Sequence, residues 1–90
     1  MTLKPFALKS LPKWRVAWKR MRSYWGLCDG ANREIALHPV LLDHPDSLLN
    51  TVIHEAVHAV DDELAEVRAE MTAAVVMEIM RRIWPQKEEE

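Results

Sequence analysis

The amino-acid sequence predicts an α+β fold in which a small antiparallel β-sheet is followed by two helices. Residues 13–38 alternate between apolar and polar side chains, residues 45–60 repeat apolar side chains with a helical period, and residues 63–84 contain neither glycine nor proline. The chain has 90 residues, which is the size of one small domain. We therefore expect a single domain over residues 1–90, ending in a polar tail at residues 86–90.

The alternating segment predicts about three strands. Residues 13–19 have large apolar side chains at the even positions and mostly basic ones at the odd positions, which is typical of a strand with one buried face. Residues 23–28 and 33–38 flank the turn sequence Asp-Gly-Ala-Asn at residues 29–32, so together they predict a β-hairpin. We expect residues 33–38 to form an edge strand just before the first helix, where an extended peptide could add to the sheet.

The first helix is predicted to carry a metal site. It contains the sequence His-Glu-Ala-Val-His at residues 54–58, and two residues four apart on a helix lie nearly above one another. Both imidazoles, those of His54 and His58, can therefore reach one metal ion. Glu55 lies about 100° around the helix and points at the open coordination position. The spacing predicts catalytic Zn²⁺ with Glu55 as the general base.

The predicted helix over residues 45–60 has separate apolar and polar faces. The residues that the helical wheel assigns to the core are Leu49, Val52, Ile53, Ala56, Val57 and Val60. Both histidines and Glu55 fall in the opposite sector. An apolar face packed on a core would fix the helix, and the other face would then offer the histidines to a cleft.

A catalytic zinc ion needs a third protein ligand and an open fourth position. The second helical segment carries Glu63, Glu66 and Glu70 within about 60° of one another on a helical wheel. This acidic stripe is where we expect the third ligand to be found.

The two motifs together resemble the gluzincin metallopeptidases, in which His-Glu-x-x-His is followed by Glu-x-x-x-Asp/Glu on the next helix. The resemblance implies that Glu66 is the third zinc ligand and that Glu70 hydrogen-bonds a metal-bound histidine, as a carboxylate commonly does in such sites. The interval between the two motifs is far shorter here than in large gluzincins. Asp62 and Glu63 therefore stay as alternative ligands.

The chain as a whole is similar to minimal zincins of the phage and prophage type. This resemblance implies a zinc-dependent metallopeptidase that acts on a peptide or protein substrate. The alternative is a catalytically weak or inactive zinc-binding regulatory or assembly protein, and a minor variant is a SprT-like protease acting on DNA-bound proteins. Tyr24, His38 and Arg68 are candidates for stabilising a tetrahedral oxyanion, since zincins often give that role to a Tyr, His or Arg.

Charge and cysteine content limit the other functions that we expect. Residues 1–33 carry eight Lys or Arg and one acid, but Trp14 and Trp18 are expected in the core, so nucleic-acid binding is not expected. The sequence has no signal-peptide pattern and no apolar stretch long enough to span a membrane, so we expect a cytoplasmic protein. Cys28 is expected to be a packed or partly exposed thiol and not a zinc ligand.

Overall fold

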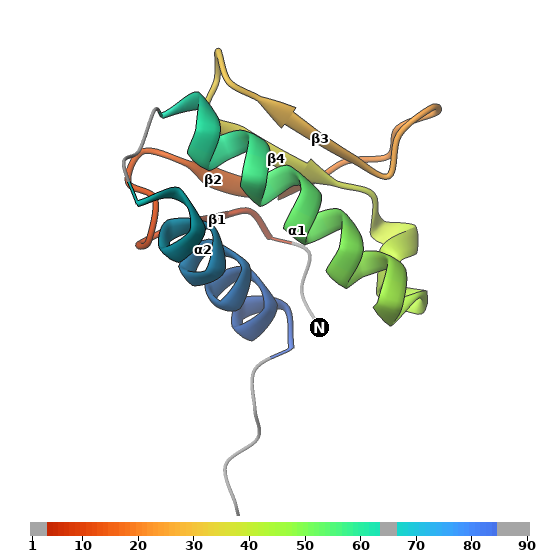
Figure 1. Cartoon of the computed structure of the whole chain (residues 1–90). Coiled ribbons are helices and arrows are strands. Elements are labelled where there is room, and N and C mark those ends of the chain that lie inside the picture. The colour runs from red at the N-terminus through yellow and green to blue at the C-terminus, as the bar shows by residue number, and fades with distance from the viewer. Residues whose placement is uncertain (1–3, 64–66, 85–90) are drawn as a thin grey trace, which may run out of the picture.

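The computed structural model describes residues 4–63 and 67–84, and it confirms the predicted α+β class. A four-stranded sheet forms one layer, and two helices cover one of its faces (Figure 1). Within the described ranges, no helix is both long and apolar enough to cross a membrane. In chain order the elements are β1 (Phe6–Ala7), β2 (Arg15–Trp18), β3 (Gly26–Asp29), β4 (Glu34–Leu37), the 3₁₀ helix η1 (Pro39–Asp43), α1 (Pro45–Asp62) and α2 (Arg68–Ile83).

The sheet is mixed and has four strands, in the order β1-β2-β4-β3, whereas an antiparallel sheet of about three strands was predicted. β3 and β4 form the predicted antiparallel hairpin, in which Cys28 lies opposite Ile35. β4 also pairs in parallel with β2, while β1, a strand of two residues, adds antiparallel to the other side of β2. The expectation that residues 33–38 form an edge strand is therefore wrong. All four residues of β4 are buried, as a central strand requires, and β3 is the edge strand.

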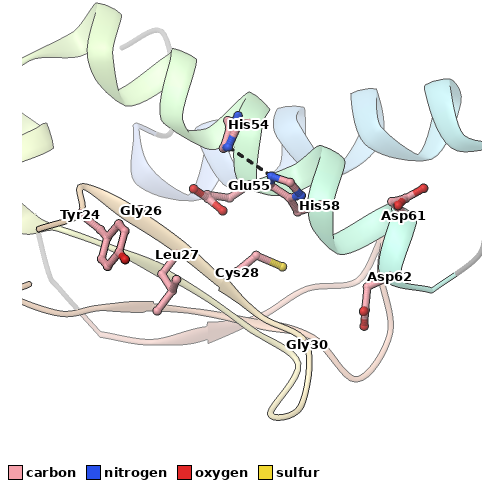
Figure 2. Close-up of a pocket in the computed structure, with 10 residues that line it drawn as sticks. All are labelled: Tyr24, Gly26, Leu27, Cys28, Gly30, His54, Glu55, His58, Asp61 and Asp62. Atoms are coloured by element: carbon pink, nitrogen blue, oxygen red, sulfur yellow. Dashed lines mark hydrogen bonds between the residues drawn. The ribbon is translucent and has the colours of Figure 1, made fainter.

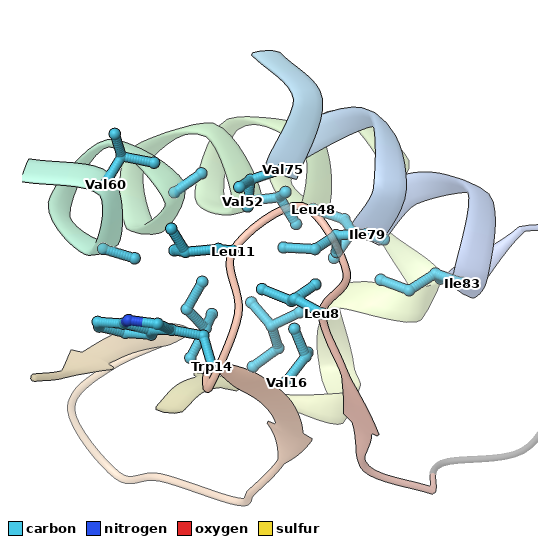
Figure 3. Close-up of a cluster of buried hydrophobic side chains, with 14 of the residues drawn as sticks. Leu8, Leu11, Trp14, Val16, Leu48, Val52, Val60, Val75, Ile79 and Ile83 are labelled. Carbon is cyan, nitrogen blue, oxygen red and sulfur yellow. The ribbon is translucent and has the colours of Figure 1, made fainter. Parts of the chain in front are cut away.

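The hydrophobic core lies between the sheet and the two helices (Figure 3). The sheet contributes Val16, Ile35 and Leu37, which alternate with residues on the opposite face. The loop between β1 and β2 adds Leu11 and the indole of Trp14, both almost completely buried. The helices contribute Leu48, Val52, Ala56, Ala59 and Val60 from α1, and Val75, Ile79 and Ile83 from α2.

The buried face of α1 is rotated from the face that the helical wheel assigned to the core. Leu49, Ile53 and Val57 are 42%, 41% and 48% exposed, although they were expected to be buried. Glu55, which was expected on the open face, is only 7% exposed. A wheel reports where apolar side chains gather on a helix, but not the direction from which a sheet and a second helix approach it. The core side of α1 is centred near Val52.

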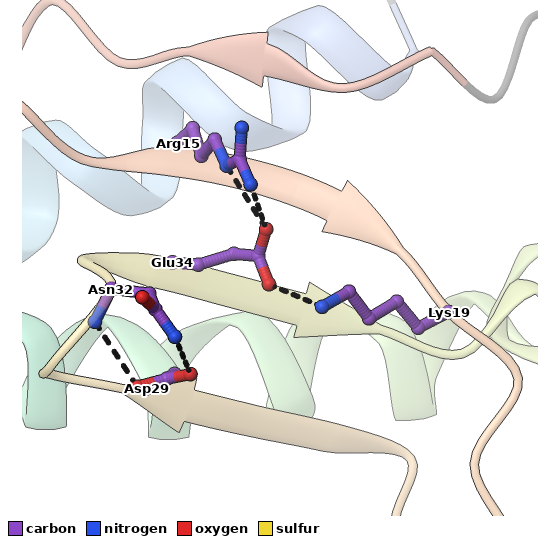
Figure 4. A network of polar contacts seen from close by, with 5 residues as sticks. All are labelled: Arg15, Lys19, Asp29, Asn32 and Glu34. Carbon is purple, nitrogen blue, oxygen red and sulfur yellow. Dashed lines mark hydrogen bonds and ion pairs between the residues drawn. The ribbon is translucent and has the colours of Figure 1, made fainter.

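Glu34 on β4 is an acidic side chain buried to 3% exposure on the sheet face opposite the core (Figure 4). Its carboxylate accepts from Arg15 Nη2 at 2.9 Å and from Lys19 Nζ at 2.7 Å, and both partners come from β2 or the residue after it. The hydrogen bond from Lys19, with the charges of Lys19 and Arg15, lowers the pKa of Glu34 even though burial opposes this. These contacts tie the two parallel strands together.

Replacing the neighbouring leucines of α1 one at a time tests the rotated face. Leu48 is fully buried and Leu49 is 42% exposed. We expect Leu48→Ala to lower the free energy of unfolding by about 2–5 kcal/mol because it leaves a cavity. Leu49→Ala should change it by about 0.5 kcal/mol. Urea unfolding of both variants measures this, and equal losses would contradict the packing described.

The pKa of Glu34 predicts how stability depends on pH. Because the folded-state pKa is lowered, the stabilisation is present above the pKa of the unfolded chain and is lost as pH falls through the folded value. We expect Glu34→Gln to lose about 1–3 kcal/mol at pH 7, since one partner of a buried contact is changed. The difference between wild type and variant should shrink as the pH is lowered. A constant difference in urea unfolding from pH 7 to acid would refute this.

Candidate metal centre

The two histidines of α1 lie one turn apart on the same exposed face (Figure 2). The Nε2 atoms of His54 and His58 are 3.2 Å apart, and the two rings meet edge to face at an angle of 78°. Two nitrogens bound to one tetrahedral zinc ion at about 2.0–2.1 Å would be about 3.3 Å apart. The separation of this pair therefore fits two ligands of a single metal ion.

Glu55 turns from the same helix toward the edge strand β3 (Figure 2). A Cβ atom added at Gly26 would lie 3.1 Å from Glu55 Oε2 and would overlap Cγ2 of Thr51. Glycine at this position lets the backbone of β3 approach α1 closely. Burial raises the pKa of the Glu55 carboxyl, while His54 and His58 lower it by a smaller amount. A carboxylate with a raised pKa is a stronger base, which suits proton abstraction near neutral pH.

Two adjoining cavities lie along α1 and β3. The larger has a volume of about 470 Å³ and is lined by Tyr24, Gly26, Leu27, Cys28, Gly30, His54, Glu55, His58, Asp61 and Asp62. The smaller, of about 430 Å³, is lined by Ser23, Tyr24, Trp25, Gly26, Asn50, Thr51, His54 and Glu55. The two sets share Tyr24, Gly26, His54 and Glu55, so the cavities adjoin at these residues, and His58 lines the larger one. The two cavities together are called the cleft.

The third ligand predicted from the sequence, Glu66, lies outside the described residues. Across residues 4–63 and 67–84, no group of three or more His, Cys, Asp or Glu side chains is placed to hold a metal ion. Asp62, one of the alternative ligands, lines the cleft beside Gly30. Glu70 is exposed in the first turn of α2. Of the ligands predicted from the sequence, the structure brings His54 and His58 together.

Glu63, the other alternative ligand, has partners outside the cleft. Its Oε2 accepts from Trp14 Nε1 at 2.6 Å and from Arg33 Nε at 3.0 Å. These two hydrogen bonds lower the pKa of Glu63. The first helix is longer than predicted, so Glu63 closes its last turn instead of starting the second helix, and its N–H bonds back to Ala59 O and Val60 O. Glu63 therefore joins the end of α1 to the sheet.

The three candidate oxyanion stabilisers occupy different places. Tyr24 lines the cleft. His38 Nδ1 accepts a hydrogen bond of 3.0 Å from the backbone N–H of Val40, so this side chain caps the N-terminus of η1. Arg68 at the start of α2 forms an ion pair with Asp61 near the end of α1, with an Nη1–Oδ1 distance of 3.1 Å. Of the three residues, Tyr24 is the one that the fold brings to the cleft.

Cys28 faces the cleft from β3 (Figure 2). Burial raises the pKa of its thiol to about 11, and the negative charges of Glu55, Asp62 and Asp29 act in the same direction. The thiol is therefore protonated near neutral pH, in accord with the packed cysteine expected from the sequence.

Sequence reasoning missed the glycines of the cleft wall. Gly26 and Gly30 contact α1 near its middle and its end, where an added Cβ would meet Glu55 and Asp62 respectively. The available signal was a glycine inside a predicted strand, which often marks a close approach of another segment.

These features describe a small α+β protein in which a helix with the sequence His-Glu-x-x-His lies beside an open strand. The chain matches the model of the SprT-like family over residues 2–69, which is more than half its length, and it belongs to that family, which is metallopeptidase-like. No curated protein and no solved structure shows significant similarity to it. The match includes all four strands and α1. It supports a SprT-like protein. Action on DNA-bound proteins and the gluzincin roles of Glu66 and Glu70 stay predictions.

Adding a methyl group at Gly26 tests the close approach of β3 to α1. We expect Gly26→Ala to lower the free energy of unfolding by about 1–3 kcal/mol because the new carbon overlaps Thr51 Cγ2. Thr51→Ser removes that atom and should restore much of the loss when combined with Gly26→Ala. Gly30→Ala is the matched control with a smaller expected effect, since the carboxylate of Asp62 can move aside. Urea unfolding of the double-mutant cycle would contradict this packing if the two changes were additive.

Proposed function

We propose that this protein is a zinc-dependent metallopeptidase that hydrolyses peptide bonds with Glu55 as the general base. The observation that carries the proposal is the 3.2 Å separation of the His54 and His58 nitrogens beside a cavity that Glu55 also lines. Membership of the SprT-like family supports the same reaction class.

The residues proposed to hold the zinc ion are His54, His58 and Glu66, with Glu70 as a hydrogen-bonding support and Asp62 as the alternative third ligand. Imidazole and carboxylate groups suit zinc. A bound zinc ion would polarise the scissile carbonyl and lower the pKa of water to about 7.

The other groups of the cleft have separate roles in this proposal. Glu55 accepts a proton from the attacking water and delivers it to the leaving amine nitrogen. β3 has one open edge, whose backbone groups can pair with an extended peptide substrate. The hydroxyl of Tyr24, which lines both cavities, donates a hydrogen bond to the oxyanion. If the substrates are proteins bound to DNA, as the SprT-like variant implies, cleavage should be faster when DNA is present.

Variants of the His-Glu-x-x-His motif at residues 54–58 test the roles of its residues separately. We expect Glu55→Gln to keep the metal content of the wild type and to lower peptide turnover by about 10²–10⁴-fold, because the base is lost while both imidazoles remain. His58→Ala should lose the metal as well as activity. His44→Ala, at an exposed histidine before α1 that stacks on Trp25, is the matched control and should keep both.

The measurements are elemental analysis after dialysis and cleavage of an unstructured protein followed by mass spectrometry. Wild-type turnover by Glu55→Gln would refute the role of the general base. A stoichiometric metal ion with no turnover in the wild type would instead favour the zinc-binding regulatory protein.

A further inference from the structure

We propose that the outer helix face, the side of α1 and α2 turned away from the sheet, binds a second copy of this chain. A two-fold axis parallel to the helices places α1 of each copy on α2 of the other. The face is formed by Leu49, Ile53 and Val57 of α1 and by Ala69, Ala73 and Met77 of α2. Dimer formation does not depend on the proposed peptidase function, because the cleft lies between α1 and β3.

Large apolar side chains are exposed on both helices of this face. α1 and α2 lie side by side and antiparallel in front of the sheet (Figure 1). Leu49, Ile53 and Val57 repeat every four residues along α1 and are 41–48% exposed. Val75 packs in the core, so Met77, about 200° around α2 from it, points away from the sheet and is 54% exposed. Solvent-facing helix positions usually carry charged side chains, so this apolar surface indicates a contact with another protein.

Charged side chains are absent from the middle of the outer helix face. The only Asp, Glu, Lys or Arg of residues 47–60 is Glu55, which is buried on the side of α1 that faces β3. The only one of residues 71–80 is Glu78, whose carboxylate accepts hydrogen bonds from the loop between β1 and β2. An apolar centre with charges only at its ends is the composition of a protein–protein interface.

The outer helix face is large enough for a dimer. α1 has 18 residues and α2 has 16, so at 1.5 Å per residue they are about 27 Å and 24 Å long. The pair is about 20 Å wide, since each helix with its side chains is about 10 Å across. The face therefore covers about 500 Å² in projection, and burying it on both copies reaches the roughly 1,000 Å² that a specific interface needs.

The shape of the face fits a copy of itself. α1 presents a ridge of branched side chains, whereas α2 presents the exposed small side chains of Ala69 and Ala73 beside Met77. A two-fold axis parallel to the helices sets the ridge of each copy against the alanines of the other, so both copies make the same contacts. Each of the four helices is then antiparallel to its neighbours, as in a four-helix bundle.

Charges at one end of the face fit the same axis. Asp46 is in the first turn of α1 and Arg81 is in the last turn of α2, and both are exposed. Because the helices are antiparallel, both residues lie at the end away from the turn that joins them. The axis therefore brings Asp46 of one copy toward Arg81 of the partner subunit, where opposite charges orient the contact.

Sedimentation of the full chain over a wide range of concentration tests the outer helix face. We expect the mass to rise from that of one chain to twice that value. Ile53→Glu and Met77→Glu should each raise the Kd of the dimer at least about tenfold, because each places a charge in an apolar contact. Leu27→Glu, the same kind of change at a similarly exposed residue of β3, should leave the Kd unchanged. Circular dichroism of each variant reports whether its helices are kept.

An exchange of charge tests the axis. Asp46→Lys and Arg81→Glu should each weaken the dimer about tenfold, because like charges then meet at both related contacts. A mixture of the two variants pairs opposite charges again, so it should form mixed dimers about as tightly as the wild type does.

The outcomes that contradict the dimer are distinct from failure of the peptidase, since no turnover is measured. The mass of a single chain at every concentration would overturn the dimer and leave the face to a different protein. A dimer broken by Leu27→Glu but not by Ile53→Glu would assign the contact to the open edge of β3 and overturn the outer helix face. Charge variants that do not recover on mixing would overturn the two-fold axis.

Discussion

The close approach of the edge strand β3 to the helix α1 is the constraint on which the candidate site depends. It is possible because Gly26 has no side chain where the helix presents Thr51 and Glu55. The contact buries Glu55 while leaving the neighbouring His54 and His58 exposed, so adjacent residues of one helix have different environments. A carboxylate with a raised pKa and two exposed imidazoles are thus obtained within five residues of one helix.

Acidic residues divide into those that stabilise the fold and those that face the cleft. Glu34 joins β2 to β4, and Glu63 joins the end of α1 to Trp14 and Arg33. These carboxylates have lowered pKa values because hydrogen-bond donors surround them. Glu55 has the opposite shift, since burial without such donors dominates its environment. The contrast separates structural carboxylates from the one proposed to move a proton.

Local patterns in the sequence were sufficient to predict some helices and strands and not others. The alternation in residues 13–38 predicted β2 and the β3–β4 hairpin, because side-chain direction along a strand is a local property. The position of β4 in the middle of the sheet depends on pairing with β2, which spacing along the chain does not encode. β1 has two residues, too few for a periodic signal. Likewise, the pairing of His54 with His58 follows from helix geometry, whereas the rotation that buries Glu55 and exposes Ile53 depends on how α1 packs.

The central claim is that His54 and His58 bind one metal ion beside Glu55. X-ray absorption spectroscopy at the zinc edge, on protein loaded with one equivalent of zinc, tests it most directly. We expect two imidazole nitrogens at about 2.0–2.1 Å from the zinc ion, with the remaining positions filled by oxygen from a carboxylate and from water. A spectrum without imidazole scattering, or one unchanged in His58→Ala, would contradict it.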